Sequence, residues 1–243
     1  MSVAYNTAIV TDSLVTYIDF TSSRSSPKTG TSPVTITDLS GRNINWTTQN
    51  TCTVNANSII TDGVTGYVYS NNTNYETAWS PSPGTYGGSS LTIELVFNSS
   101  DTSGNLISRN WNGSGEYNYR MTPTDFSLTV VSNAASFSYS NICTGSTVHM
   151  TWWMNAVQYG VYRNGQVLVG ATNHGLTGAG APTYGSGANG TLIGSLYPYG
   201  QGWAGNSGFS IAGTFYLCRI YNRVLLDSEI LQNFNATRGR FGI

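Results

Sequence analysis

The carboxylate side chains are the first candidates for chemistry, and this chain of 243 residues has only eleven of them. Hydrolysis of a glycosidic bond needs two carboxyl groups that flank the bond, one acting as the acid and the other as base or nucleophile. No set of acidic residues has a spacing that predicts such a pair. Asp227 and Glu229 are close in sequence, but they suit the N-terminus of a helix. Glu94 stands alone among apolar neighbours, which favours a satisfied residue on a strand face.

The histidines and cysteines indicate no stronger site. His149 falls in a predicted strand and His174 in a predicted loop, and neither lies beside a G-x-S-x-G nucleophile turn. Cys52, Cys143 and Cys218 are too widely spaced for a typical zinc site, and without an export signal we expect buried free thiols. We therefore predict no catalytic residues and no enzymatic activity.

Three aromatic, glycine-rich segments are candidate binding sites: residues 197–203, 109–119 and 79–86. Sugars bind β-sandwiches by stacking on exposed rings, while amide and hydroxyl groups contact the sugar hydroxyls. The candidate glycan-binding or interface residues are Tyr197, Tyr199, Gln201, Trp203, Trp111, Tyr117 and Trp79. The alternative for each segment is a loop packed on its own aromatic side chains, or a protein interface.

The composition excludes some partners. Only 9% of the residues are charged and the net charge is -1, so there is no basic surface of the kind that binds nucleic acid. Residues 166–218 contain no Asp, Glu, Lys or Arg, but they are rich in Gly, Ser, Asn and Tyr, which argues against insertion into a membrane. The first thirteen residues lack the basic start and apolar run of a signal peptide.

The elements that would position these residues are mostly strands. Alternating apolar residues predict strands over 14–20, 91–97, 126–131 and 148–154, and Asn164-Gly165 predicts the two-residue turn of a hairpin over 158–170. In the last strand, alternation would place Phe215, Leu217 and Arg219 on one face. Ile230, Leu231 and Phe234 predict one short helix near the C-terminus. Many short strands with one helix indicate an all-β, two-sheet antiparallel sandwich.

Two segments resemble the laminin-G-like domains, which have a concanavalin A-like jelly-roll fold. Residues 147–169 read TVHMTWWMNAVQYGVYRNGQVLV, and residues 213–230 read GTFYLCRIYNRVLLDSEI. The family has a strand that leads into a VNG hairpin at the first place and a closing strand and helix at the second. The resemblance covers nearly the whole chain and implies one domain over residues 13–243, and we expect an N-terminal arm over residues 1–12.

The same resemblance bears on metal binding and catalysis. Related domains can hold a calcium ion in turns such as those of Asp38 and Asp62, which makes these two residues calcium candidates. The alternative is that Asp favours turns because its side chain bonds to nearby backbone. No other cofactor is expected. The endo-glucanases of this fold carry an E-x-D-x-x-E arrangement, which this chain lacks. Leu226 stands where the family usually has a Ser before the helix, so we expect Asp227 to cap the helix.

The tail over residues 230–243 resembles the ending of laminin-G-like structural proteins of tailed bacteriophages. That resemblance implies a non-enzymatic virion protein, a head decoration or a fibre or surface appendage, that adheres through glycan binding. The alternatives are a free glycan-binding lectin module and a glycoside hydrolase. The expected partners are capsid or fibre subunits, further copies of this chain in a homo-oligomer, and a host surface glycan. The expected location is the virion surface, after assembly in the host cytoplasm.

Overall fold

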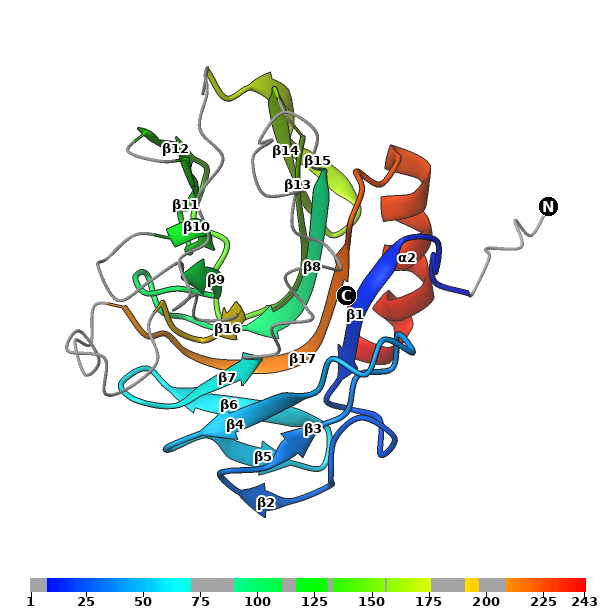
Figure 1. Cartoon of the computed structure of the whole chain (residues 1–243), viewed down its shortest axis with the longest axis vertical. Coiled ribbons are helices and arrows are strands. Elements are labelled where there is room, and N and C mark those ends of the chain that lie inside the picture. Colours follow the sequence, from blue (N-terminus) through cyan, green and yellow to red (C-terminus); the bar gives the residue numbers. More distant parts are fainter. Residues whose placement is uncertain are drawn as a thin grey trace.

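A computed structural model describes residues 8–70, 90–110, 117–130, 133–155, 157–175, 191–196 and 209–243. Two antiparallel sheets face each other, and one helix, α2 (Asp227–Phe241), lies on the outer side of one sheet (Figure 1). The predicted all-β jelly-roll sandwich with a C-terminal helix is therefore confirmed. Within the described ranges, no helix has the length and apolar character needed to cross a membrane.

The larger sheet, called sheet A, carries α2. Its strands are β1 (Leu14–Asp19), β2 (Gly30–Thr31), β5 (Thr53–Asn55), β6 (Ser58–Asp62), β8 (Leu91–Asn98), β13 (Thr147–Met154), β14 (Gln158–Arg163), β15 (Gln166–Asn173) and β17 (Ala212–Tyr221). Strand β17 is central, because it pairs with β8 along one side and with β6 and then β1 along the other.

The second sheet, called sheet B, faces the inner side of sheet A. Its strands are β3 (Thr35–Ile36), β4 (Trp46–Gln49), β7 (Tyr67–Ser70), β9 (Ile107–Asn110), β10 (Tyr117–Met121), β11 (Asp125–Val130), β12 (Asn133–Ser138) and β16 (Thr191–Ile193). The main core lies between the sheets, and strand alternation supplies it from sheet A with residues such as Ile93, Leu95, Met150 and Trp152.

Local sequence accounts for several elements. Asn164 and Gly165 have φ of 50° and 72° and join β14 to β15, as the two-residue hairpin turn requires. Trp153 alternates with Trp152, so it points outward and packs beneath α2 with Ile230 in a second apolar cluster. Cys52, Cys143 and Cys218 are buried and free, as expected.

The predicted alternation of the last strand is wrong at one point. The pairing of β17 with β8 shifts register between Phe215 and Leu217, as at a β-bulge. Phe215 therefore belongs to the core with Cys218 and Ile220, whereas Arg219 lies on the outer face. The bulge also leaves Tyr216 half-buried, with its ring beside that of Phe241 at the end of α2.

Residues 8–12 of the N-terminal segment pack against α2 and the loop before it. The backbone N–H of Val10 donates to Asn233 Oδ1 at 2.8 Å, and Gln232 Nε2 donates to the backbone oxygen of Ala8 at 2.9 Å. Asp12 Oδ2 forms an ion pair with Arg223 Nε at 2.9 Å. Residues 8–12 thus help to fasten α2 to sheet A.

Candidate functional site

A fully buried ion pair lies on the outer face of sheet A, under α2. Register places Arg219 of β17 directly opposite Glu94 of β8, and Arg219 Nε lies 3.0 Å from Glu94 Oε2. Both side chains are 0% exposed. Glu94, predicted as a satisfied residue on a strand face, therefore has a partner of opposite charge that its apolar neighbours in sequence do not indicate.

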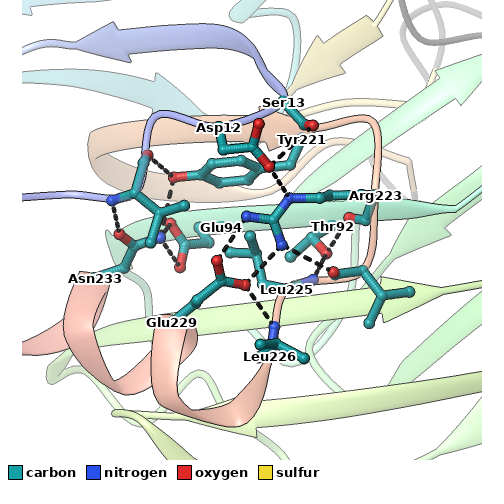
Figure 2. Close-up of polar contacts among 12 residues, drawn as sticks. Asp12, Ser13, Thr92, Glu94, Tyr221, Arg223, Leu225, Leu226, Glu229 and Asn233 are labelled. Carbon is teal, nitrogen blue, oxygen red and sulfur yellow. Dashed lines mark hydrogen bonds and ion pairs between the residues drawn. The ribbon is translucent and has the colours of Figure 1, made fainter.

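Helix α2 completes this polar cluster with one amide side chain. Asn233 Nδ2 donates to Glu94 Oε1 at 3.1 Å and Oε2 at 3.0 Å, and it lies 3.0 Å from the hydroxyl of Tyr221. That hydroxyl donates to the backbone oxygen of Val10 at 3.1 Å. Figure 2 shows Glu94, Asn233 and Tyr221 converging from the sheet and the helix. The cluster holds the helix, the sheet and the N-terminal segment together.

The cluster strongly perturbs its titratable groups. Burial, and then the charge of Arg219, lower the pKa of His149 to about 3, so this imidazole is neutral although its Nε2 lies 3.7 Å from Glu94 Oε1. Burial raises the pKa of Glu94, while Arg219 and the Asn233 amide oppose that rise. Because these groups are sealed from solvent, they act on folding and not on a bound molecule.

A second, more exposed cluster sets the start of α2. The carboxylate of Glu229 accepts the backbone N–H of Leu226 at 2.8 Å and bonds to Arg223 Nη1 at 2.6 Å and Nη2 at 2.7 Å (Figure 2). The hydrogen bond from Arg223 lowers the pKa of Glu229. Asp227 instead accepts a hydrogen bond from Tyr162 at 2.7 Å, so the expectation that Asp227 caps the helix is wrong.

Most of the candidate glycan-binding or interface residues lie outside the described residues. These are Tyr197, Tyr199, Gln201, Trp203, Trp111 and Trp79. Tyr117 begins β10 and pairs with Asn110 of β9. For all seven residues, a role in glycan binding or in an interface stays a prediction.

The calcium candidates use their carboxylates to hold turns. Asp38 accepts the backbone N–H of Tyr17 at 2.9 Å, of Ser40 at 3.0 Å and of Ile44 at 3.2 Å. Asp62 accepts three successive backbone N–H groups, those of residues 64–66, at 2.8–3.0 Å. Partial burial would raise the pKa of Asp62, but these bonds and one from Thr51 outweigh burial and lower it to about 2. Among the described residues, no three His, Cys, Asp or Glu side chains group to hold a metal ion.

The described part of the chain has an open hollow on the outer side of sheet A, at the C-terminal end of α2. The hollow has a volume of about 370 Å³, within the range of about 300–1,000 Å³ that is typical of small-molecule sites. Its lining residues are Thr21, Asn57, Thr147, Tyr216, Arg240 and Phe241. They come from the segment after β1, the β5–β6 turn, β13, β17 and α2, so only the folded chain assembles them.

Two aromatic rings and several polar groups make this hollow suitable for a polar ligand. The rings of Tyr216 and Phe241 have centroids 5.4 Å apart at an interplanar angle of 44°. Within the described ranges, the side chains of Asn57, Thr147 and Tyr216 make no hydrogen bond to the protein. Their amide and hydroxyl groups are therefore available to a ligand. Together with the rings they can contact both the apolar face and the hydroxyls of a sugar.

One side of the hollow is held by a charged contact. Arg240 Nη1 lies 2.7 Å from Asp19 Oδ2, and its Cζ lies 4.6 Å from the centroid of the Phe241 ring. Asp19 is 3% exposed, whereas the side chain of Arg240 is 42% exposed. The guanidinium is thus fixed on two sides and open to solvent on the rest.

Sequence reasoning missed this hollow. One available signal was the dipeptide Arg240-Phe241, which ends the helix with a cation beside a ring. Another was Lys28, the single lysine of the chain, which bonds to the backbone next to the hollow. Neither signal indicates which distant residues complete the site.

Comparisons with known proteins agree on the fold. No family model matches the chain, and no curated protein matches it. A Trypanosoma rangeli sialidase in complex with sialic acid matches with a TM-score of 0.65 and 18% identity, over 96% of this chain and 34% of the sialidase. The same sialidase as a covalent intermediate with 2,3-difluorosialic acid matches with a TM-score of 0.64 and 18% identity, over 93% of this chain and 33% of that one.

The receptor-binding domain of a botulinum neurotoxin of C/D mosaic serotype is also similar. Its TM-score is 0.60 at 12% identity, over 93% of this chain and 52% of that one. The chain therefore spans about a third of the sialidase and about half of the toxin fragment. At these identities the likeness concerns the β-sandwich fold.

The prediction that the chain is not an enzyme is wrong, because the sequence does not exclude enzymatic activity. It depended on the spacing of carboxylates in the sequence, yet the same fold occurs within the chains of sialidases, over 93–97% of this chain in the structures cited and in a variant with trans-sialidase activity. A missing E-x-D-x-x-E arrangement does not separate this chain from such proteins.

Proposed function

We propose that this chain is a glycan-recognition β-sandwich that is carried on the surface of a tailed-phage virion, as a head decoration or a fibre subunit. The observation that carries the recognition function is the open hollow, where the rings of Tyr216 and Phe241 lie beside amide and hydroxyl groups that no described residue bonds. The virion location is supported by the resemblance of residues 230–243 to phage structural proteins.

Two further observations favour recognition of a glycan. The similar structures include a sialidase bound to sialic acid and the receptor-binding domain of a toxin. The composition, with 9% charged residues and many Tyr, Asn, Ser and Gly, resembles that of adaptable recognition surfaces. The depletion of Lys, Asp and Glu also suits contacts with capsid or fibre subunits and with further copies of the chain.

A glycan array with the full chain tests the recognition function. We expect the wild-type protein to bind a subset of glycans, and Tyr216→Ala to weaken that binding about tenfold because a stacking ring is lost. Tyr69→Ala is the matched control, since Tyr69 is a half-buried tyrosine on β7 of sheet B. Its binding should equal that of the wild type.

Two results would contradict the proposal. The absence of any bound glycan would remove the recognition function, and undiminished binding by Tyr216→Ala would remove the hollow as its site. Chromatography of each bound glycan after incubation would also detect cleavage. Release of a sugar would make the chain a glycoside hydrolase as well as a binding protein.

A further inference from the structure

Cationic groups are scarce in this chain, yet two of its ten border the hollow. Arg240 lines it directly. Lys28 lies beside it, because its Nζ donates to the backbone oxygens of Thr21 at 3.0 Å and Ala56 at 2.9 Å. Thr21 and Asn57, which follows Ala56, are both lining residues. No acidic residue is among the lining residues that the structure describes.

In the described part of the chain, the acidic partner of Arg240 is Asp19, which is buried and already well bonded. Its oxygens accept the backbone N–H of Thr21 at 3.0 Å, the hydroxyl of Thr21 at 2.6 Å and the hydroxyl of Tyr17 at 3.2 Å, besides the ion pair with Arg240. These bonds stabilise the carboxylate without help from solvent. A ligand in the hollow therefore meets the exposed guanidinium and not the carboxylate that holds it.

Arg240 is prepared to bind a second carboxylate. A guanidinium has five N–H donors in a rigid fork, and in the described structure a single nitrogen, Nη1, contacts Asp19. The stacked Phe241 ring and Asp19 restrict its orientation, so less side-chain entropy is lost on binding. Bidentate pairing with a carboxylate is the geometry that such a fork favours.

We propose that the hollow selects acidic sugars, with Arg240 binding the sugar carboxylate while Tyr216 and Phe241 contact the ring. This inference rests on the proposed glycan-binding function and names the ligand class of the same site. Asn57 and Thr147 contact the remaining hydroxyls, and Lys28 adds positive potential at the edge.

Matched pairs of polysaccharides test the inference with the wild-type protein. Each pair consists of an acidic polysaccharide, rich in uronic or sialic acid, and the same polymer after chemical reduction of its carboxyl groups. We expect binding, measured by biolayer interferometry, to be at least tenfold tighter for the acidic member of the pairs that bind. We also expect it to weaken when salt is raised, because the recognised groups are charged.

Two arginine variants then test the role of Arg240 in this preference. Arg240→Gln should abolish the preference: the ratio of the affinities for the acidic and reduced members should fall from at least ten to about one. Arg238→Gln is the matched control, because Arg238 is an exposed arginine on the same helix that does not line the hollow. Circular dichroism and the melting temperature of each variant verify that the fold is kept.

The possible failures are distinct. Equal affinity for the acidic and reduced members would overturn the selection of acidic sugars and leave glycan recognition standing. A preference for the acidic member that survives in Arg240→Gln would remove Arg240 from that selection. Failure to bind any member of any pair, or any glycan on the array, would overturn both proposals.

Discussion

At the scale of single residues, the buried pair of Glu94 and Arg219 makes the clearest prediction. We expect Glu94→Gln to lower the free energy of unfolding by about 3–5 kcal/mol, because Arg219 would keep its charge in a site that is 0% exposed without a counter-charge. Arg219→Met should have an effect of similar size. Urea unfolding of both variants measures the change.

The double variant Glu94→Gln with Arg219→Met is the control for this prediction. It removes both charges and leaves neither unpaired. Its loss in the free energy of unfolding should therefore be smaller than the sum of the losses of the two single variants. Strict additivity of the two losses would mean that the pair is not coupled and would contradict the role given to it.

His149 makes stability depend on pH. The pKa of His149 is lowered from an ordinary 6.5 to about 3, so below pH 6.5 the unfolded chain binds a proton that the folded chain does not. Stability from this residue is complete above pH 6.5 and decreases as pH falls toward 3. Relative to His149→Phe, the wild type should lose about 2 kcal/mol between pH 7 and pH 5, at about 1.4 kcal/mol per pH unit below 6.5.

Unfolding in urea at a series of pH values checks this difference. The groups that face the imidazole are Glu94, Arg219 and the ring of Phe234, whose plane is within 10° of the imidazole plane. Glu94 and Arg219 are present in both proteins, so the difference between their stability curves reports the imidazole. Parallel stability curves for the two proteins would contradict the assignment.

At the scale of elements, the start of α2 leaves room for improvement. Leu226 is the N-cap residue, with φ of -69° and ψ of 154°, and its side chain is 65% exposed and makes no cap hydrogen bond. Leu226→Ser would supply a hydroxyl that accepts a free N–H of the first turn. We expect a gain of about 1 kcal/mol in the free energy of unfolding, measured by urea denaturation.

Val157→Ser is the control for the cap. Val157 is also an exposed apolar residue, at 53%, but it precedes a strand and not a helix. Its substitution should change stability little. A gain that is no larger for Leu226→Ser than for Val157→Ser would show that lost apolar exposure, and not the cap, causes the effect.

Elements with local signals could be predicted from the sequence, and contacts between distant elements could not. Alternation gave the positions of β8, β11 and β13, and Asn164-Gly165 gave the hairpin, because each signal lies within a few residues. The bulge at residues 215–217 was missed because no turn residue marks it. The hollow was missed because its charged contact joins Asp19 and Arg240, which are 221 positions apart.

At the scale of the whole molecule, the two proposals converge on how the chain is presented. The hollow lies on the outer side of sheet A, near the C-terminal end of α2, and residues 8–12 lie along the same helix. A virion that presents this face would expose the hollow to glycans outside. A virion that buries this face would make it a contact with another subunit.

Immunogold electron microscopy of intact phage particles distinguishes these arrangements. An antibody raised against a peptide of residues 227–243, which contain α2 and the lining residues Arg240 and Phe241, should label particles if the face is presented. Label over the head would indicate a decoration protein, and label at fibre tips would indicate a receptor-binding subunit. The control is an antiserum against the whole chain, which detects the protein in any orientation. Particles that bind the whole-chain serum but not the peptide antibody would place the hollow at an interface between subunits, and particles that bind neither would contradict a virion surface location.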